Sequence, residues 1–316
     1  MKKLTLQKAN DITFREGCEK YLDDCGVRNL REGTIGHYRQ SYVQFYKYFD
    51  PDMPVSEFSE KHYNDYIMYL KEAVGNDQSI NSYLRDLITT VHFWINQAWV
   101  KPFRMRTIKF DKHQVETYSD SELRKLLKKP DMKKCSFTEY QCWVITSFLF
   151  STGIRQRSLH FIKIKDIDFD NEIVHINVTK NRKPLIVPLS QSMVRILREY
   201  LKLRPYESTE EYLFVNVFGR QLCKGTSYHM LYWYNKGRGV ERTGIHRYRH
   251  TFAKQWILNG GNVVTLSKLL GHSSLDITQD YIHLLVTDLG KEVKAMNLLD
   301  KFAPREAIKL KREEVE

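Results

Sequence analysis

The segment HRYRHTFA, His246–Ala253, places two histidines and two arginines within five consecutive residues. Cationic groups this close together repel one another unless an anion lies between them. On a helix, His246 and Arg249 are three positions apart and therefore share a face. A guanidinium group can bind two phosphate oxygens at once, and an imidazole can donate or move a proton near neutral pH. The segment therefore predicts a helix that presents a phosphate-binding face.

The same segment also has the His-x-x-x-His spacing of a zinc protease, formed by His246 and His250. In that motif the residue after the first histidine is the general-base glutamate, and here it is Arg247. Because arginines beside a dication would repel it, we expect no metal site in this segment.

The composition favours a polyanionic partner. The chain has 316 residues, a net charge of +12 and a pI of about 9.3, and most of the excess positive charge lies in the C-terminal two-thirds. This length is enough for two domains. No apolar run reaches transmembrane length and the first residues hold no apolar signal segment, so we expect a cytoplasmic, nucleoid-associated protein. The five cysteines form no C-x-x-C pair, which predicts buried free thiols.

Residues 1–105 predict a small bundle of four amphipathic helices, with Thr34 as the N-cap of the second. Residues 106–117 are rich in lysine and arginine and have no helical period, so they predict a basic linker. The apolar residues that define the four helices recur every three or four positions: Phe14, Cys18, Tyr21, Leu22 and Cys25; Ile35, Tyr38, Tyr42, Phe45, Tyr46 and Phe49; Tyr63, Tyr66, Ile67 and Leu70; Ile80, Leu84, Leu87, Val91 and Trp94.

Residues 118–316 predict a second domain that is mostly helical with a small antiparallel sheet, an α+β fold. Ser119 and Glu122 have the spacing of a capping box at a helix start, and Gly153 ends the helix that follows. The period then changes to two in NEIVHINVTKNRKPLIVPLS, which predicts a β-hairpin with Lys180 in its turn. Further helices are predicted near residues 191–201 and from 244 onward, with Gly271 as a later helix stop.

Three residues outside the opening segment suggest chemistry only in combination. Arg155 opens a helix, where a cation is unfavourable unless it faces an anion; a surface arginine is the alternative. Lys180 alone is a solvated turn lysine, although beside a phosphate it could protonate a leaving oxygen. Tyr281 alone is a packing residue, whereas near several cations it becomes a candidate nucleophile.

Taken together, five motifs in this order resemble the tyrosine recombinase (phage integrase) family. The resemblance covers the whole second domain, and more loosely the four-helix first domain, which resembles the core-binding DNA-binding domain of the family. The matching residues are Arg155 in TGIR, Lys180 in TKNRKPLIVPL, His246 and Arg249 in HRYRHTFA, Gly271 and His272 in LLGH, and Tyr281 in TQDYIHL.

The resemblance implies that residues 118–316 form a catalytic domain that cuts and rejoins DNA strands. Tyr281 would attack the scissile phosphodiester, form a 3′-phosphotyrosine and release a 5′-hydroxyl. Lys180 would be the general acid for that hydroxyl, with Lys183 as its competitor. Neither a metal ion nor ATP is implied.

The remaining positions that match the family would bind the phosphate. Arg155 and Arg249 would hold its non-bridging oxygens, His272 would hold a phosphate oxygen, and His246 would accept a proton or donate a hydrogen bond near the tyrosine. Many members carry an acidic residue that helps orient the first arginine, but this chain has Ser158 there. The orientation of Arg155 must therefore come from elsewhere.

The resemblance further implies a C-shaped clamp around double-stranded DNA with inverted half-sites, and a homotetramer on DNA. A tail from about residue 285 would be exchanged between subunits, because Leu285, Leu289, Val293 and Met296 form an apolar stripe; docking on its own core is the alternative. An excisionase is a candidate accessory partner. We expect the integrase of a mobile genetic element, with three alternatives: an Xer-type chromosome dimer resolvase, a type IB topoisomerase-like enzyme, or a DNA-binding protein without catalysis.

Overall fold

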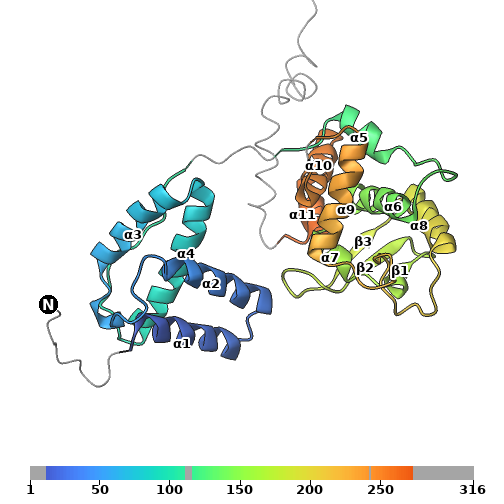
Figure 1. Cartoon of the computed structure of the whole chain (residues 1–316). Coiled ribbons are helices and arrows are strands. Elements are labelled where there is room, and N and C mark those ends of the chain that lie inside the picture. The colour runs from blue at the N-terminus through green and yellow to red at the C-terminus, as the bar shows by residue number, and fades with distance from the viewer. Residues whose placement is uncertain (1–11, 111–115, 242, 273–316) are drawn as a thin grey trace, which may run out of the picture. The chain divides into compact units, whose positions relative to one another are not determined.

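The computed structural model describes residues 12–110, 116–241 and 243–272 of the chain. The chain divides into two compact units, Met1–His113 and Gln114–Glu316 (Figure 1). Each unit has a large hydrophobic core of its own. No helix in these described ranges is long and apolar enough to span a bilayer.

The first unit consists of four helices around an aromatic core. They are α1 (Phe14–Val27), α2 (Glu32–Phe45), α3 (Glu60–Ala73) and α4 (Asp77–Asn96), with the 3₁₀ turn η1 (Val55–Glu57) before α3. The four predicted helices are therefore confirmed. In the core, the ring of Phe14 stacks on Phe49 and meets Trp94 edge to face.

The predicted start of α2 was wrong. The N-cap is Arg31, and the backbone N–H of Thr34 already donates to the carbonyl of Arg31 at 2.7 Å. Thr34 therefore lies inside the first helical turn, and Arg31 makes no side-chain capping bond that would have revealed the boundary.

The chain after α4 packs back onto the first unit. Phe103 and Ile108 contact its core, and the hydroxyl of Tyr63 donates to the carbonyl of Arg106 at 2.9 Å. The side-chain amide of Asn81 bonds both backbone groups of Ile108, at 2.8 and 2.9 Å. The first part of the basic segment is thus held by specific bonds.

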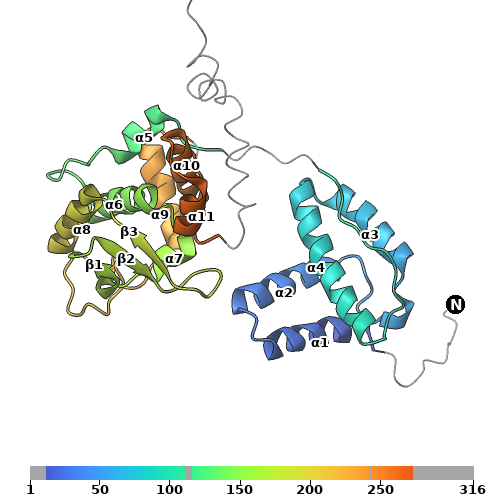
Figure 2. The ribbon, with the colours of Figure 1, turned by 180° about the vertical axis from the view of Figure 1, so that it is seen from behind.

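The second unit is built around α6 (Phe137–Thr152), which is buried on nearly all sides. Helices α5 (Asp120–Leu127), α8 (Gln191–Leu203), α9 (Lys224–Gly237) and α10 (Ile245–Leu258) pack against α6, and α11 (Val263–Leu270) packs on α10. Two short helices, α7 (Gln156–His160) and η2 (Ile164–Asp166), lead into the sheet. Figure 2 shows this unit from behind.

The sheet has three antiparallel strands in the order β1 (Ile167–Asp168), β2 (Ile173–Ile176) and β3 (Leu185–Pro188). In the β2–β3 pair, Val174 faces Val187 and Ile176 faces Leu185. Lys180 lies in the turn between these strands, as predicted. The mostly helical fold with a small antiparallel sheet is therefore confirmed.

Three details of the second unit differ from the sequence prediction. Strand β1 was not predicted, because it is only two residues long. Strand β2 ends at Ile176, earlier than the alternating pattern, which continues to Val178, predicts; the carbonyl of Val178 instead accepts from the hydroxyl of Ser158. Helix α9 was missed altogether.

Cys18, Cys25 and Cys142 are buried free thiols, but Cys223 at the N-cap of α9 is exposed.

Candidate active site

Two helices of the second unit end at the same place, and each ends at a left-handed glycine. Gly153 closes α6 with φ 61°, and Gly271 closes α11 with φ 59°. A helix end leaves carbonyl groups without intrahelical partners and carries a partial negative charge, so it attracts cations. Both glycines were predicted as helix stops from the sequence.

Two arginines bind these helix ends. Arg249 comes from α10 and is 5% exposed; its Nη1 donates to the carbonyl of Gly153 at 2.9 Å and its Nη2 to that of Leu270 at 2.8 Å. Arg155, the N-cap residue of α7, directs Nη1 at the carbonyls of Leu270 and Gly271, at 3.3 and 3.4 Å. The structure therefore brings Arg155 and Arg249 together at one carbonyl oxygen.

His272 lies beside this arginine pair. Nη2 of Arg249 is 2.7 Å from Nε2 of His272. Because a guanidinium group can only donate, Nε2 must accept, and the ring is neutral with its proton on Nδ1. Burial and the charges of Arg249 and Arg155 lower the pKa of His272 to about 4. His272 is thus held in its neutral form beside the two arginines.

The two histidines of α10 are also held in the neutral form. Burial lowers the pKa of His246, and so do the charges of Arg249, Arg155 and Lys224. Burial, followed by His246 and Arg249, lowers the pKa of His250 to about 4. A phosphate bound among these groups would offset the positive charge and raise all three histidine pKa values.

Two cavities open onto this cluster. One, of about 350 Å³, is lined by Arg155, Arg249 and His272 together with Lys183 of the β2–β3 turn. The other, of about 510 Å³, is lined by residues of α9 and α10 that include Lys224 and His246. Arg155, Arg249 and His272 therefore line one opening, and His246 lines the other.

The two candidate general acids differ in their surroundings. Both lysines are exposed in the β2–β3 turn, but Lys183 lines the cavity with the arginines. Asn181, between them, donates Nδ2–H to the carbonyl of Gly271 at 3.5 Å. Tyr281, the predicted nucleophile, lies outside the described residues, so its place relative to this cluster stays a prediction.

Sequence reasoning missed several residues of the site. His250 could have been found, because it follows His246 by four positions and shares its helical face. Lys224 and Tyr228, which line the larger cavity, could not, since α9 itself was not predicted. Asn181 sits between two lysines in a turn, and nothing in the local sequence marks it as a contact to Gly271.

A mostly helical unit with a small sheet, in which two arginines and a neutral histidine line one cavity, is suited to bind the phosphate groups of a polyanion. The phage integrase family model matches residues 117–287, more than half of the chain. The chain belongs to this family, and it is a site-specific DNA recombinase of the tyrosine recombinase type, an enzyme that cleaves and rejoins DNA.

Similar proteins include a bacterial tyrosine recombinase and two integrases of known structure. The tyrosine recombinase XerC of Staphylococcus aureus (strain MRSA252) is 26% identical over 281 residues, covering 86% of this chain and 93% of that protein. The Tn1549 transposon integrase in complex with transposon right end DNA has a TM-score of 0.72 at 16% identity, covering 90% of this chain and 100% of that one. The lambda integrase tetramer bound to a Holliday junction has a TM-score of 0.69 at 16% identity, covering 86% and 78%. Both solved structures share the fold.

Proposed function

We propose that this recombinase cleaves each DNA strand through a 3′-phosphotyrosine on Tyr281, within a phosphate site formed by Arg155, Arg249 and His272. The convergence of both guanidinium groups on the carbonyl oxygen of Leu270 carries the proposal. Two donors that meet at one oxygen can also meet at the oxygens of a phosphodiester that enters the adjoining cavity. Such preorganised donors stabilise the charge of a five-coordinate transition state.

The histidines complete this arrangement. His272, which lies beside Arg249, is assigned to hydrogen-bond a phosphate oxygen. His246, neutral and open to solvent, is suited to accept the tyrosine proton or to hydrogen-bond the phosphate. Side-chain cations supply the positive charge that the reaction requires.

A nicked suicide duplex tests this chemistry. Cleavage near the nick releases a short fragment by diffusion, so religation fails and a covalent protein–DNA complex accumulates. We expect the complex to survive denaturing electrophoresis and to place the phosphotyrosine at Tyr281 by peptide mass spectrometry. Absence of any complex on a duplex that the protein binds and recombines would contradict the mechanism.

We propose Lys180 as the general acid, with Lys183 as the competing residue. Loss of a general acid slows a reaction by about 10²- to 10⁴-fold, so Lys180→Ala is expected to slow cleavage by that amount. A substrate with a 5′-bridging sulfur has a better leaving group and should recover much of the rate. The single-turnover cleavage rate on both substrates measures this.

Lys183→Ala is the matched control, since both lysines lie in the same turn. Lys183 lines the cavity that contains Arg155 and Arg249, so it is the competing candidate for the general acid, and the sulfur substrate decides between the two lysines. Rescue of Lys183→Ala but not of Lys180→Ala would transfer the role to Lys183.

We propose that the substrate is double-stranded DNA with inverted half-sites, bound by both units. The net charge of +12 supports this, because phosphate contacts dominate the affinity of proteins for DNA. The affinity should therefore fall steeply with salt. On DNA the protein acts as a tetramer, and residues from about 285 onward dock on a neighbouring subunit.

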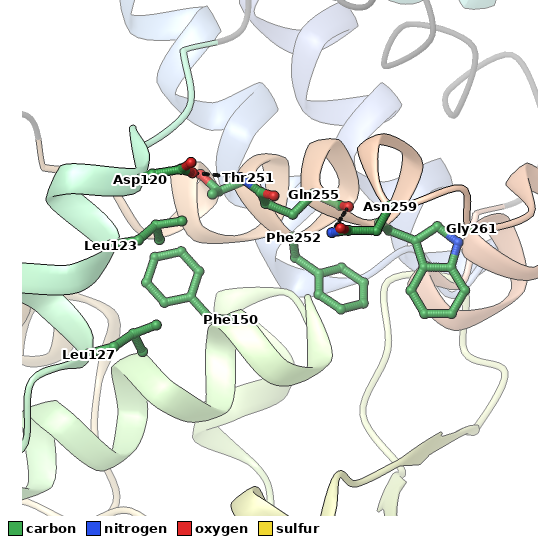
Figure 3. Close-up of a pocket in the computed structure, with 10 residues that line it drawn as sticks. Asp120, Leu123, Leu127, Phe150, Thr251, Phe252, Gln255, Asn259 and Gly261 are labelled. Carbon is green, nitrogen blue, oxygen red and sulfur yellow. Dashed lines mark hydrogen bonds between the residues drawn. The ribbon is translucent and has the colours of Figure 1, made fainter. Parts of the chain in front are cut away.

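An apolar groove of the second unit fits this tail. It has a volume of about 610 Å³ and lies between α5, α6 and α10 (Figure 3). Leu123 and Leu127 of α5 and Phe150 of α6 line one part, and Phe252 and Trp256 of α10 line the other. The groove matches in chemistry the predicted apolar stripe of the tail, Leu285, Leu289, Val293 and Met296.

Leu127→Glu tests this docking. Leu127 is 40% exposed and lines the groove, whereas Leu258 is 42% exposed and does not line it, so Leu258→Glu is the matched control. Losing one buried leucine costs about 1.5–3 kcal/mol, so Leu127→Glu should weaken assembly of protomers on DNA by about tenfold or more. Native gel shifts that resolve one protomer from several measure this. If the two variants assemble equally well on DNA, the groove is not the docking site of the tail.

We propose the integrase of a mobile genetic element as the biological role. The likeness in fold to the Tn1549 integrase is compatible with it, whereas the 26% identity to XerC over most of both chains favours the Xer-type alternative. Excisionase or transfer genes beside the coding sequence would support the first role. A recombination assay on plasmids that carry two copies of the host's chromosome dimer site would support the second.

A further inference from the structure

Helix α7 carries the first arginine of the site at its start. The helix has only five residues, Gln156–His160, and Arg155 is its N-cap. A helix this short has little stability of its own. The direction of Arg155 therefore depends on what the side chains of α7 contact.

One side of α7 is tied to the hairpin. Ser158 is 5% exposed, and its hydroxyl donates to the carbonyl of Val178 at 2.8 Å, two residues before Lys180. The family resemblance implies an acidic residue at this position. A carboxylate could not donate to that carbonyl, so this chain anchors α7 in a different way.

The other side of α7 is tied to α9 by a contact of three residues, Gln156, His160 and Ser227, called here the α7–α9 contact. Gln156 and His160 are four positions apart and share a helical face. Nε2 of Gln156 lies 3.0 Å from Oγ of Ser227, and Nε2 of His160 lies 2.8 Å from the same oxygen. Ser227 is 1% exposed and His160 is 6% exposed, so these bonds are shielded from water.

The hydrogen bonds of this contact can all be satisfied together. The Ser227 hydroxyl has one proton, which it can donate to the carbonyl of Lys224 at 3.2 Å or to His160. In either case it accepts from Gln156, whose amide also reaches the carbonyl of Lys224 at 3.3 Å. Burial lowers the pKa of His160, which keeps the ring neutral. A buried polar network with every bond made holds its members rigidly.

The same turn of α9 faces the site. Lys224 and Tyr228 flank Ser227 in that turn, and both line the cavity that His246 lines, as does Gln156. We infer that Ser227 is a positioning residue that holds Arg155 through Gln156 and His160. The contact links the placement of α9 to the orientation of the arginine. This inference rests on the proposed role of Arg155 in binding the scissile phosphate.

The test measures cleavage and binding separately. Ser227→Ala removes the oxygen that joins the two helices. We expect its single-turnover cleavage rate on the nicked suicide duplex to fall about ten- to a hundredfold, as displacement of a reacting group does, while its Kd for DNA stays within about twofold.

A conservative substitution at His160 should preserve its bond to Ser227 and therefore the cleavage rate. The amide nitrogen of a glutamine can occupy the place of Nε2, so His160→Gln should cleave at close to the wild-type rate. His160→Leu fills similar space without a polar group and should be as slow as Ser227→Ala.

Two controls separate positioning from general loss of stability. Tyr200→Phe removes a buried hydroxyl that donates to Gln141 at 2.7 Å in the same unit, away from α7, and should leave the cleavage rate unchanged. In a double-mutant cycle with Arg155→Lys, Ser227→Ala should lower the cleavage rate little further, because both changes act through the side chain at position 155.

The outcomes distinguish this inference from the proposed function. Full additivity in the cycle, or a Ser227→Ala variant that cleaves as fast as wild type, overturns the inference alone. A wild-type chain that forms no covalent complex overturns the phosphotyrosine mechanism and this inference with it.

Discussion

Tyr281→Phe is expected to abolish covalent capture of DNA while the Kd for the duplex stays near the wild-type value. The change removes one oxygen, which is the attacking atom, and leaves the ring and every cation of the phosphate site in place. We propose no other hydroxyl that could attack the phosphorus in place of the Tyr281 oxygen. The nicked suicide duplex measures capture, and a gel shift on the intact duplex measures binding.

A second variant makes this result specific. Arg249→Lys keeps Tyr281 and one positive charge but loses the bidentate fork, so capture should slow without disappearing. A covalent complex formed by Tyr281→Phe at the wild-type rate would overturn the assignment of the nucleophile.

Gly153→Ala is expected to cause the largest loss of stability at the site. A Cβ at this position would lie 2.4 Å from Cδ1 of Phe252 and 2.9 Å from Cδ2 of Leu270, which real contacts do not allow. The left-handed φ of 61° costs an alanine at least about 1 kcal/mol, and overpacking costs about 1–3 kcal/mol more. The free energy of unfolding should therefore fall by about 2–4 kcal/mol, measured by urea denaturation.

Gly271→Ala is the matched control. Its φ of 59° is nearly the same, but the nearest atom to its Cβ would be Cδ2 of Leu185 at 3.5 Å, an ordinary contact. Only the backbone cost of about 1 kcal/mol remains. Equal losses in the two variants would show that the contact with Phe252 is not what requires a glycine at 153.

Local signals in the sequence were enough to predict much of the fold. The capping box of Ser119 and Glu122 starts α5, and Gly153 ends α6, because each depends on residues within one turn. Helix α9 lacks such signals, since its exposed side carries aromatic residues such as Trp233, which is 68% exposed. Its buried side includes polar Ser227 and Asn235, so no apolar stripe marks it.

The residues of the site were easier to predict than their partners. Arg155 and Arg249 followed from their motifs, but the carbonyl of Leu270 that joins them lies more than twenty positions from Arg249 and over a hundred from Arg155. Such a meeting point depends on how α10 and α11 pack. The inferred support of Arg155 by Ser227 also joins residues far apart in sequence, so the sequence showed that Ser158 is not an acid but not what orients Arg155 instead.

The bonds of Arg249 to two helix ends have a consequence for evolution. Replacing a functional group can raise stability, but the guanidinium of Arg249, proposed to bind the phosphate, also satisfies the carbonyls of Gly153 and Leu270. A descendant that abandoned strand exchange and kept only DNA binding would still be under selection to retain this arginine. Retention of this arginine in a descendant would therefore not by itself show that strand exchange is retained.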